Sequence, residues 1–212
     1  MLRYLTIAVT SFQQNCSLLW CDQTMKAAVI DPGGDLEEVL AEVKRLGVTL
    51  EQIWITHAHI DHAGAAAELA ERLSLPIVGP HPGDQFWIDG LEQQAKMFGV
   101  PTVRAFTPTR WLADGDTVEL GHSTLAVRHC PGHTPGHVVF YSKEANRAFV
   151  GDVLFSGSIG RTDFPQGDHA TLIHSIRSKL WPMGDATVFI PGHGPESTFG
   201  RERRTNPFVA DH

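Results

Sequence analysis

The residues with the clearest capacity for chemistry form the run His-Ala-His-Ile-Asp-His at positions 57–62. This run follows directly on the apolar segment 53–55, which is typical of a buried strand. Imidazole and carboxylate groups are the ligands that zinc, iron and manganese use when a site must also hold a water molecule. We therefore interpret positions 57–62 as the centre of a metal site.

The spacing within this run predicts two adjacent ions. In an extended segment, residues two positions apart point to the same side, so His57 and His59 can reach one ion together. Asp61 and His62 precede the helix-like segment 63–69, where they would occupy the first turn and point in another direction. The alternative is a solvated histidine loop in which Asp61 only caps a helix.

Later segments repeat one design, in which a strand-like run ends at Gly or Pro and a metal-binding residue type follows. The run 125–128 leads to a Pro-Gly-His ending at His133, 147–150 leads to Asp152, and 186–190 leads to a Pro-Gly-His ending at His193. Rigid strands that carry ligands at their ends on one rim of a sheet are what a preorganised site requires. We therefore expect these segments to converge on a single metal centre.

The order His-x-His-x-Asp-His, His, Asp, His resembles the metallo-β-lactamase superfamily, and within it the glyoxalase II (hydroxyacylglutathione hydrolase) branch in a short bacterial form. The resemblance extends from Asn15 to about His193. It implies an α/β (α+β) fold, a four-layer αββα sandwich with the metals at one edge.

The resemblance also implies how the ligands divide between two divalent metal ions per chain. It places His57, His59 and His133 on the first ion. It places Asp61, His62 and His193 on the second ion, with Asp152 bridging the two. Zinc is the first expectation, and iron and manganese remain open because these ligands accept all three metals.

The chemistry follows from charge. Two divalent ions carry more positive charge than Asp61 and Asp152 neutralise. A water shared by the ions would therefore have a pKa near 7, by analogy with single-zinc sites. The metal-bound hydroxide can attack an acyl carbon while an ion stabilises the oxyanion. Asp61 is our candidate catalytic residue, because it can orient this hydroxide while it holds its ion. A thioester substrate suits the site, since a thiolate leaves with little help from an acid.

The substrate is inferred mainly from resemblance. The segment 160–164, Gly-Arg-Thr-Asp-Phe, resembles the family segment whose basic residue contacts the glutathione moiety, which makes Arg161 the candidate substrate-binding residue. The alternative is that Arg161 pins its own loop through Asp163. Because His193 lies close to the end of the 212-residue sequence, we expect no C-terminal helical substrate domain of the kind found in larger glyoxalase II enzymes, and hence a more open site.

Three classes of function remain open. The leading hypothesis is hydrolysis of S-(2-hydroxyacyl)glutathione, such as S-lactoylglutathione. The second is a mononuclear iron persulfide dioxygenase, a family with this fold and a similar Gly-Arg-Thr-Asp-Phe stretch, in which residues matching His57, His133 and Asp152 hold Fe(II). The third is a binding protein with a structural metal. Another hydrolase of the same fold is also possible, although Asp61 and the lack of an export signal disfavour a β-lactamase.

The composition agrees with one domain over residues 1–212, with 42% hydrophobic and 19% charged residues. The net charge of -7 disfavours a nucleic-acid partner. We see no signal peptide and no apolar run near the roughly 20 residues that span a bilayer. We therefore expect a cytoplasmic protein without a membrane partner, and the sequence does not indicate its oligomeric state.

The remaining sequence gives coarse expectations. Asp35 is a candidate N-cap for a helix ending before Gly47, one helix is expected over 84–98, and Asp168 is a candidate cap for a helix reaching Lys179. The three cysteines argue against a disulfide scaffold, and Cys130 is expected to be a buried thiol. His137 is expected to have a structural role at the start of a strand, although a place behind a metal ligand is the alternative.

Overall fold

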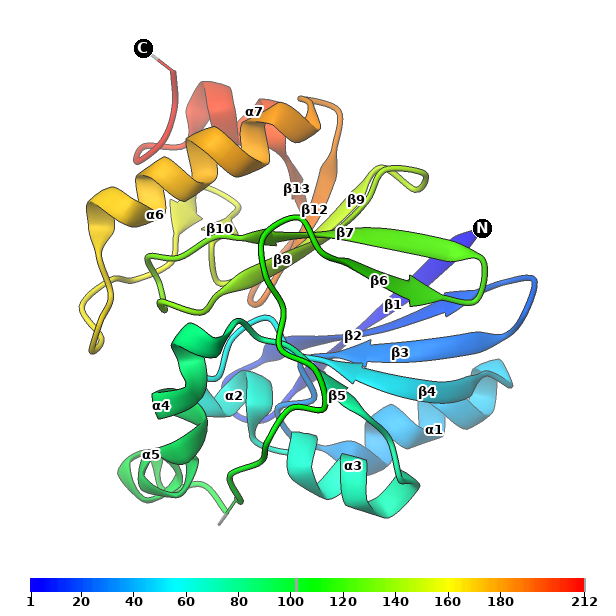
Figure 1. Cartoon of the computed structure of the whole chain (residues 1–212). Helices are drawn as coiled ribbons and strands as arrows, with labels where there is room; N and C mark the ends of the chain where they lie inside the picture. The colour runs from blue at the N-terminus through cyan, green and yellow to red at the C-terminus, as the bar shows by residue number, and fades with distance from the viewer. Residues whose placement is uncertain (102, 212) are drawn as a thin grey trace.

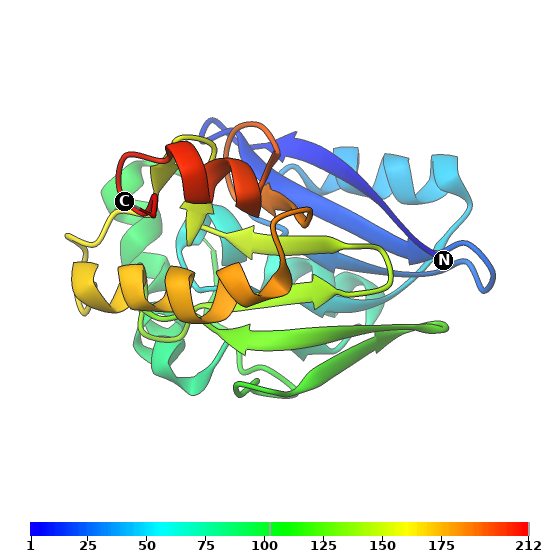
Figure 2. The same cartoon turned by 90° about the horizontal axis from the view of Figure 1, so that it is seen from above.

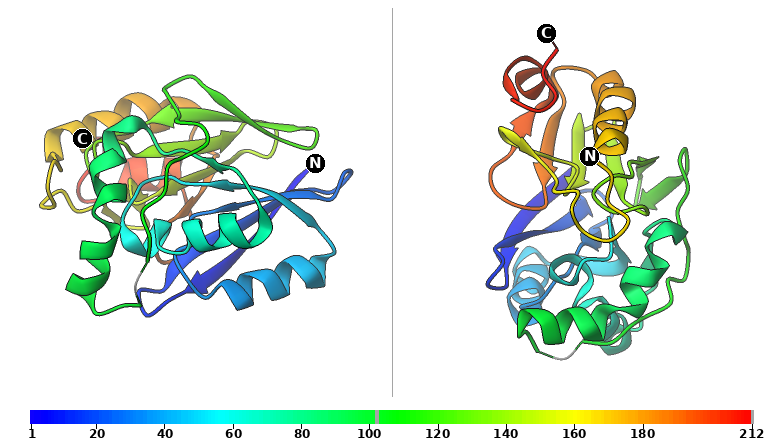
Figure 3. Two further views of the ribbon diagram at one scale, coloured as in Figure 1. Left: turned by 60° about the horizontal axis from the view of Figure 1, so that its bottom comes forward. Right: turned by 90° about the vertical axis from the view of Figure 1, so that its left-hand side faces the viewer.

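Two β-sheets pack face to face, with helices on their outer faces, in the computed structural model, which describes residues 1–101 and 103–211 (Figure 1). One sheet has the strand order β1-β2-β3-β4-β5 and the other the order β13-β12-β9-β8-β7-β6. Helices α1 and α3 lie outside the first sheet, and α6 and α7 lie outside the second (Figures 1 and 2). Views from two further sides show the same layers, which confirm the predicted αββα sandwich (Figure 3).

The first sheet and its helices comprise β1 Leu2–Val9, β2 Gln14–Cys21, β3 Lys26–Ile30, α1 Leu36–Leu46, β4 Thr49–Trp54, α2 Ile60–Ala63, α3 Ala66–Leu73, β5 Ile77–Val78, the 3-10 turn η1 Pro82–Asp84, α4 Gln85–Asp89 and α5 Leu91–Phe98. The second sheet and its helices comprise β6 Thr117–Leu120, β7 Ser123–His129, β8 Val138–Ser142, β9 Arg147–Gly151, α6 His169–Ser175, the π-helical turn η2 Ile176–Leu180, the 3-10 turn η3 Trp181–Met183, β12 Val188–Pro191, β13 Ser197–Thr198 and α7 Phe199–Thr205. A small hairpin, β10 Leu154–Phe155 and β11 Ser158–Ile159, lies beside them.

Strand β3 shows how the layers form. Its side chains alternate between the two faces of the sheet, as strand geometry requires. Ala27 and Val29 belong to the core on the side of α1, whereas Ala28 and Ile30 belong to the core between the sheets. Because both faces are buried, the strand is apolar almost throughout, as is usual where a parallel neighbour such as β4 pairs with it.

The core between the sheets is built on aromatic contacts. Trp54 of β4 stacks on Phe140 of β8, with ring centroids 5.3 Å apart, and neither ring is exposed. Phe149 of β9 meets Tyr4 of β1 edge to face at 5.6 Å. These pairs fix the first sheet against the second close to the strand ends that carry the candidate ligands.

Two helices differ from the sequence prediction. The helix expected over 84–98 is broken at Gly90 into α4 and α5, and Phe98 is 45% exposed while Leu91 is fully buried. Asp35 does not cap α1, because its backbone is left-handed with φ 48° and its carboxylate instead accepts a hydrogen bond from the Thr10 amide. The capping role of Asp168 is confirmed, since its side chain accepts from the Thr171 amide.

The three cysteines are free and buried, as expected. Within residues 1–101 and 103–211, no helix combines the length and the apolar character needed to cross a membrane.

Removal of the aromatic contact between the sheets tests this packing. We expect Phe140→Ala to lower the free energy of unfolding by about 3–5 kcal/mol, because a fully buried ring is replaced by a cavity. Phe208→Ala is the matched control, and at 50% exposure it should cost less than about 1 kcal/mol. Equal losses for the two variants, measured by urea denaturation, would contradict this account of the core.

Candidate metal centre

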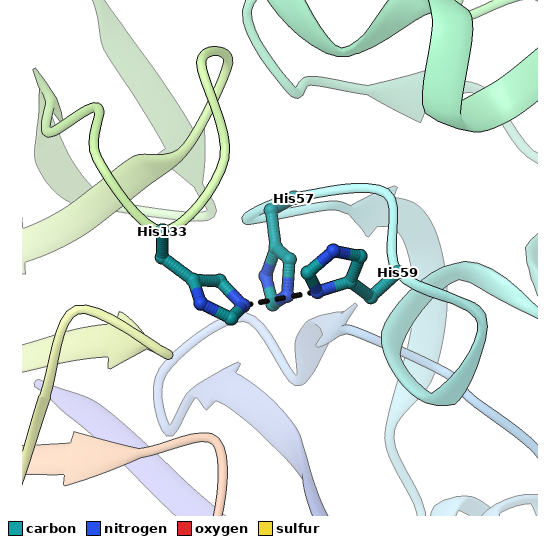
Figure 4. A group of neighbouring side chains, drawn as sticks. All are labelled: His57, His59 and His133. Atoms are coloured by element: carbon teal, nitrogen blue, oxygen red, sulfur yellow. Dashed lines mark hydrogen bonds between the residues drawn. The ribbon is translucent and has the colours of Figure 1, made fainter. Parts of the chain in front are cut away.

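All the sequence-predicted metal-binding residues meet at one edge of the sandwich, beyond the ends of β4, β7, β9 and β12. The potential ligand atoms of His57, His59 and His133 all lie within 4.8 Å of one another (Figure 4). Those of Asp61, His62 and His193 do the same in a second group. These groups match the two sets expected from the sequence, and their role as ligands stays a prediction.

Asp152 faces both groups. Its Oδ1 lies 3.3 Å from Nε2 of His62, and its Oδ2 lies 3.6 Å from Nε2 of His133. The same Oδ2 is 3.8 Å from Nε2 of His193. A carboxylate between two sets of imidazoles is the arrangement that a bridging ligand needs.

Backbone carbonyls orient two of the histidines. Nδ1 of His133 donates a hydrogen bond to the carbonyl oxygen of Arg161 at 2.7 Å, and Nδ1 of His193 donates to that of Phe12 at 3.2 Å. Because a carbonyl oxygen can only accept, each Nδ1 carries a hydrogen and each Nε2 is turned toward the other candidate ligands. Nε2 of His133 lies 2.9 Å from Nδ1 of His59, and Nε2 of His193 lies 3.0 Å from Oδ2 of Asp61. Metal-binding histidines are held in this way in other proteins.

Asp31, which follows β3, orients two more histidines and was missed by the sequence analysis. Its Oδ2 accepts hydrogen bonds from Nδ1 of His62 at 2.9 Å and from the Thr56 hydroxyl at 2.6 Å, and its Oδ1 accepts from the Thr56 amide. The Thr56 oxygen in turn lies 3.0 Å from Nδ1 of His57. Although Asp31 groups with His57 and His62 as a possible ligand, these donors already occupy its oxygens. Its position directly after a strand, before Pro-Gly, was the signal that could have found it.

His137 lies directly behind the centre. Its ring stacks on that of His57 with centroids 4.5 Å apart, and its Nε2 accepts a hydrogen bond from the Asp152 amide at 3.0 Å. Gly151 has a φ of 49°, and a Cβ there would lie 2.7 Å from the His137 ring, so this close approach requires glycine. The alternative considered from sequence, a place behind a ligand, therefore describes His137 better than a role limited to the strand start.

Asp84 ties the two histidine loops together. Its buried carboxylate accepts hydrogen bonds from the Ala58 amide and the Thr134 hydroxyl, both at 2.9 Å, and from the Gly136 amide at 2.6 Å. Burial raises the pKa of Asp84 to about 6. The first loop is thereby fixed to the second, which carries His133.

Burial and charge divide the centre into a part with neutral imidazoles and a part where, despite burial, ionised carboxylates raise the pKa of the neighbouring His62 and His193. Burial lowers the pKa of His57 well below its usual value and that of His59 to about 3, so these imidazoles are neutral and have lone pairs to offer. Burial opposes ionisation of Asp152, but attraction by His62 outweighs it and holds the pKa of Asp152 well below its usual range. The pKa of Asp61 is lowered in the same way.

Unpaired polar atoms show that these residues fit metal ions. Among the described residues, Nε2 of His57, Nε2 of His59 and Oδ1 of Asp152 are buried without a hydrogen-bond partner. Buried polar atoms in folded proteins are almost always paired, so a concentration of free lone pairs calls for an explanation. Divalent cations would provide it. Cys130 does not contribute, because burial raises the pKa of its thiol to about 12.

A cavity of about 740 Å³ opens beside the centre. Arg161 stands at its margin, exposed, with its guanidinium held by both carboxylate oxygens of Asp163 at 2.7 and 2.6 Å and placed 4.1 Å from the centre of the Phe164 ring. The loop-pinning contact considered from sequence is therefore present. The contact with substrate stays a prediction.

Asp31→Asn tests whether the residues that orient the candidate ligands strengthen metal binding. We expect a 10- to 100-fold weaker affinity for the metal, on the order of what such changes cost elsewhere, because the amide cannot accept from both His62 and Thr56. Competition with a chromogenic chelator measures this affinity. Asp35→Asn is the matched control, since within the described residues the Asp35 carboxylate accepts one hydrogen bond, from the Thr10 amide of a loop. An Asp31→Asn protein that binds metal as tightly as the wild type would refute the orienting role.

Comparisons with known proteins agree with this geometry. The family model described as metallo-beta-lactamase superfamily matches residues 9–193. The chain is 47% identical to hydroxyacylglutathione hydrolase GloC of Haemophilus influenzae, over 96% of each chain. It is similar to the crystal structure of BLEG-1 B3 metallo-beta-lactamase, with a TM-score of 0.90 and 36% identity over 99% of this chain and all of that one. It is also similar to TTHA1623 in a di-iron-bound form, with a TM-score of 0.88 and 38% identity over 97% and 100% of the two chains. These matches confirm the resemblance, including the glyoxalase II branch, and the chain belongs to the metallo-β-lactamase superfamily.

Proposed function

We propose that the protein is a metal-dependent hydrolase of S-(2-hydroxyacyl)glutathione thioesters, such as S-lactoylglutathione. The observation that carries this proposal is the position of Asp152 between two groups of potential ligands, beside a cavity large enough for a substrate. The identity with a hydroxyacylglutathione hydrolase over nearly the whole of both chains supports the choice of substrate.

The proposal assigns His57, His59 and His133 to one ion, and Asp61, His62 and His193 to a second. Asp152 would contact both. Zinc is our first choice of metal, with iron and manganese as alternatives that the same ligands accept. Similarity to a protein described in a di-iron-bound form supports a centre of two ions.

When bound, the ions supply a hydroxide at neutral pH and polarise the thioester carbonyl. Asp61 lines the cavity with an ionised carboxylate, so it can accept a hydrogen bond from the attacking water and aim it at the acyl carbon. The water oxygen forms the new C–O bond, the C–S bond breaks, and the products are a carboxylate, a thiol and a proton. No serine or cysteine nucleophile is needed.

Arg161 is the proposed contact for an anionic group on the thiol part of the substrate. Asp163 and the Phe164 ring hold its guanidinium in one orientation at the cavity margin. A guanidinium recognises a carboxylate well in this setting, and the glutathione moiety carries carboxylates.

A second candidate is the mononuclear iron persulfide dioxygenase, favoured by the proximity of His133 to Asp152 at 3.6 Å beside the buried, unpaired Nε2 of His57. One iron per chain and oxygen uptake with glutathione persulfide would establish it. The neighbour described as a B3 metallo-beta-lactamase makes β-lactam hydrolysis a further reaction to assay. We also propose a cytoplasmic location, since a reducing compartment suits the free cysteines.

Asp152→Ala tests the bridging role. We expect the wild type, purified without added metal, to contain close to two ions per chain, and the variant to lose both the ions and the turnover of S-lactoylglutathione. Elemental analysis and the fall in thioester absorbance measure the two effects. Asp168→Ala, which removes only the cap of α6, should keep both. Full turnover by Asp152→Ala would show that Asp152 does not bridge.

Arg161→Ala and Asp163→Ala together separate substrate contact from loop pinning. If Arg161 contacts substrate, its removal raises KM for S-lactoylglutathione about ten-fold, the loss expected for one charged hydrogen bond. Asp163→Ala then lowers KM, because it removes a carboxylate that competes for the guanidinium. Equal increases in KM for both variants, in steady-state kinetics, would favour pinning.

A further inference from the structure

The cavity beside the metal centre is larger and more apolar than a lactoyl group requires. Its volume is about 740 Å³, toward the upper part of the range usual for small-molecule sites. Apart from the candidate ligands, its wall is dominated by aromatic and aliphatic side chains. Arg161 is the only Lys or Arg among the described residues that line it. The cavity therefore favours a ligand with a large apolar part.

One end of this cavity, the arginine end, consists of Trp87, Arg161 and Phe164. The Trp87 ring lies 4.7 Å and the Phe164 ring 5.0 Å from the ring of His59, between centroids. This end thus adjoins the histidines assigned to the first ion. It contains the Arg161 guanidinium, which can bind an anionic group on the thiol part of the substrate.

The other end, the phenylalanine end, consists of Phe12, Met97, Phe98 and Phe155. The Phe12 and Phe98 rings meet edge to face at 5.7 Å, and the Phe155 ring lies 6.3 Å from that of His193. The Phe12 carbonyl also accepts the hydrogen bond from His193. This end therefore adjoins the residues assigned to the second ion, and the two ends lie on either side of the centre.

Helix α5 presents part of the phenylalanine end to solvent. Met97 is 71% exposed and Phe98 45% exposed, although both line the cavity. The helix is held in place by the buried Gln94, which accepts from the Ile60 amide at 3.0 Å and donates to the Trp87 carbonyl at 3.0 Å. An exposed apolar surface that is fixed beside a reactive centre is typical of a ligand-binding groove.

We propose that the phenylalanine end is an acyl subsite, and that the preferred substrates are thioesters whose acyl group is bulky and apolar, either branched or aromatic. This inference rests on the proposed hydrolase function. The thiol part of the substrate would place an anionic group at Arg161, and the scissile carbonyl would lie at the metal centre. The acyl group must then extend toward Phe12 and Phe98. A lactoyl group covers little of that surface, whereas each further methylene that is buried there strengthens binding by about four-fold.

Two thioesters that share glutathione and the 2-hydroxyl group test the subsite. The two compounds differ only at the carbon that carries the 2-hydroxyl group. This carbon bears a methyl group in S-lactoylglutathione and a phenyl group in S-mandeloylglutathione. After division by their rates of alkaline hydrolysis, we expect kcat/KM to be about ten-fold higher for the phenyl compound, as apolar pockets discriminate elsewhere. Phe98→Ser should reduce this ratio about ten-fold.

Met97→Ser is the second variant, since its more exposed side chain can be replaced without disturbing the Phe12 contact, and it should reduce the same ratio. Leu73→Ser is the matched control: Leu73 is an exposed apolar residue at the end of α3, outside the cavity, and the ratio should not change. Turnover of the lactoyl compound with no phenyl preference, or with a ratio that neither variant alters, would overturn the subsite alone. Turnover of neither thioester by the metal-loaded protein would overturn the proposed function as well.

Discussion

The buried carboxylate of Asp152 is the constraint on which the site depends. An ionised carboxylate in a protein interior costs several kcal/mol unless opposite charge or hydrogen-bond donors surround it. Here the surrounding groups are imidazoles that come from separate parts of the chain, and His62 contributes most of the attraction that keeps Asp152 ionised. Because these segments are far apart in sequence, only convergence of strand ends at one edge of the sandwich can assemble them.

The residues behind the ligands explain how this arrangement can be rigid. Asp31 connects His62 to His57 through Thr56, so that one carboxylate sets the orientation of an imidazole in each ligand group. His137 fixes the backbone of Asp152 itself. A site whose ligands are held by further hydrogen bonds on strand ends loses little entropy when it binds a metal, which is what preorganised catalysis requires.

Local patterns in the sequence predicted that the candidate ligands converge, and the resemblance to a known superfamily predicted the layer architecture. Neither predicted the contacts between distant segments. The alternation of His57 and His59 and the repeated Pro-Gly-His are local features, and each reports a strand followed by a turn. The hydrogen bond from His62 to Asp31 depends instead on how β3 pairs with β4, which no periodicity encodes. The same holds for the contact between Phe12 and Phe98, so the aromatic wall could be seen only in the folded chain.

Anomalous X-ray scattering from crystals of the zinc-loaded protein, recorded on both sides of the zinc absorption edge, tests the central claim most directly. We expect two peaks about 3.5–4 Å apart, the spacing of two-metal sites, with the Asp152 carboxylate between them. One peak held by His57, His133 and Asp152 alone, or peaks remote from Asp152, would contradict it.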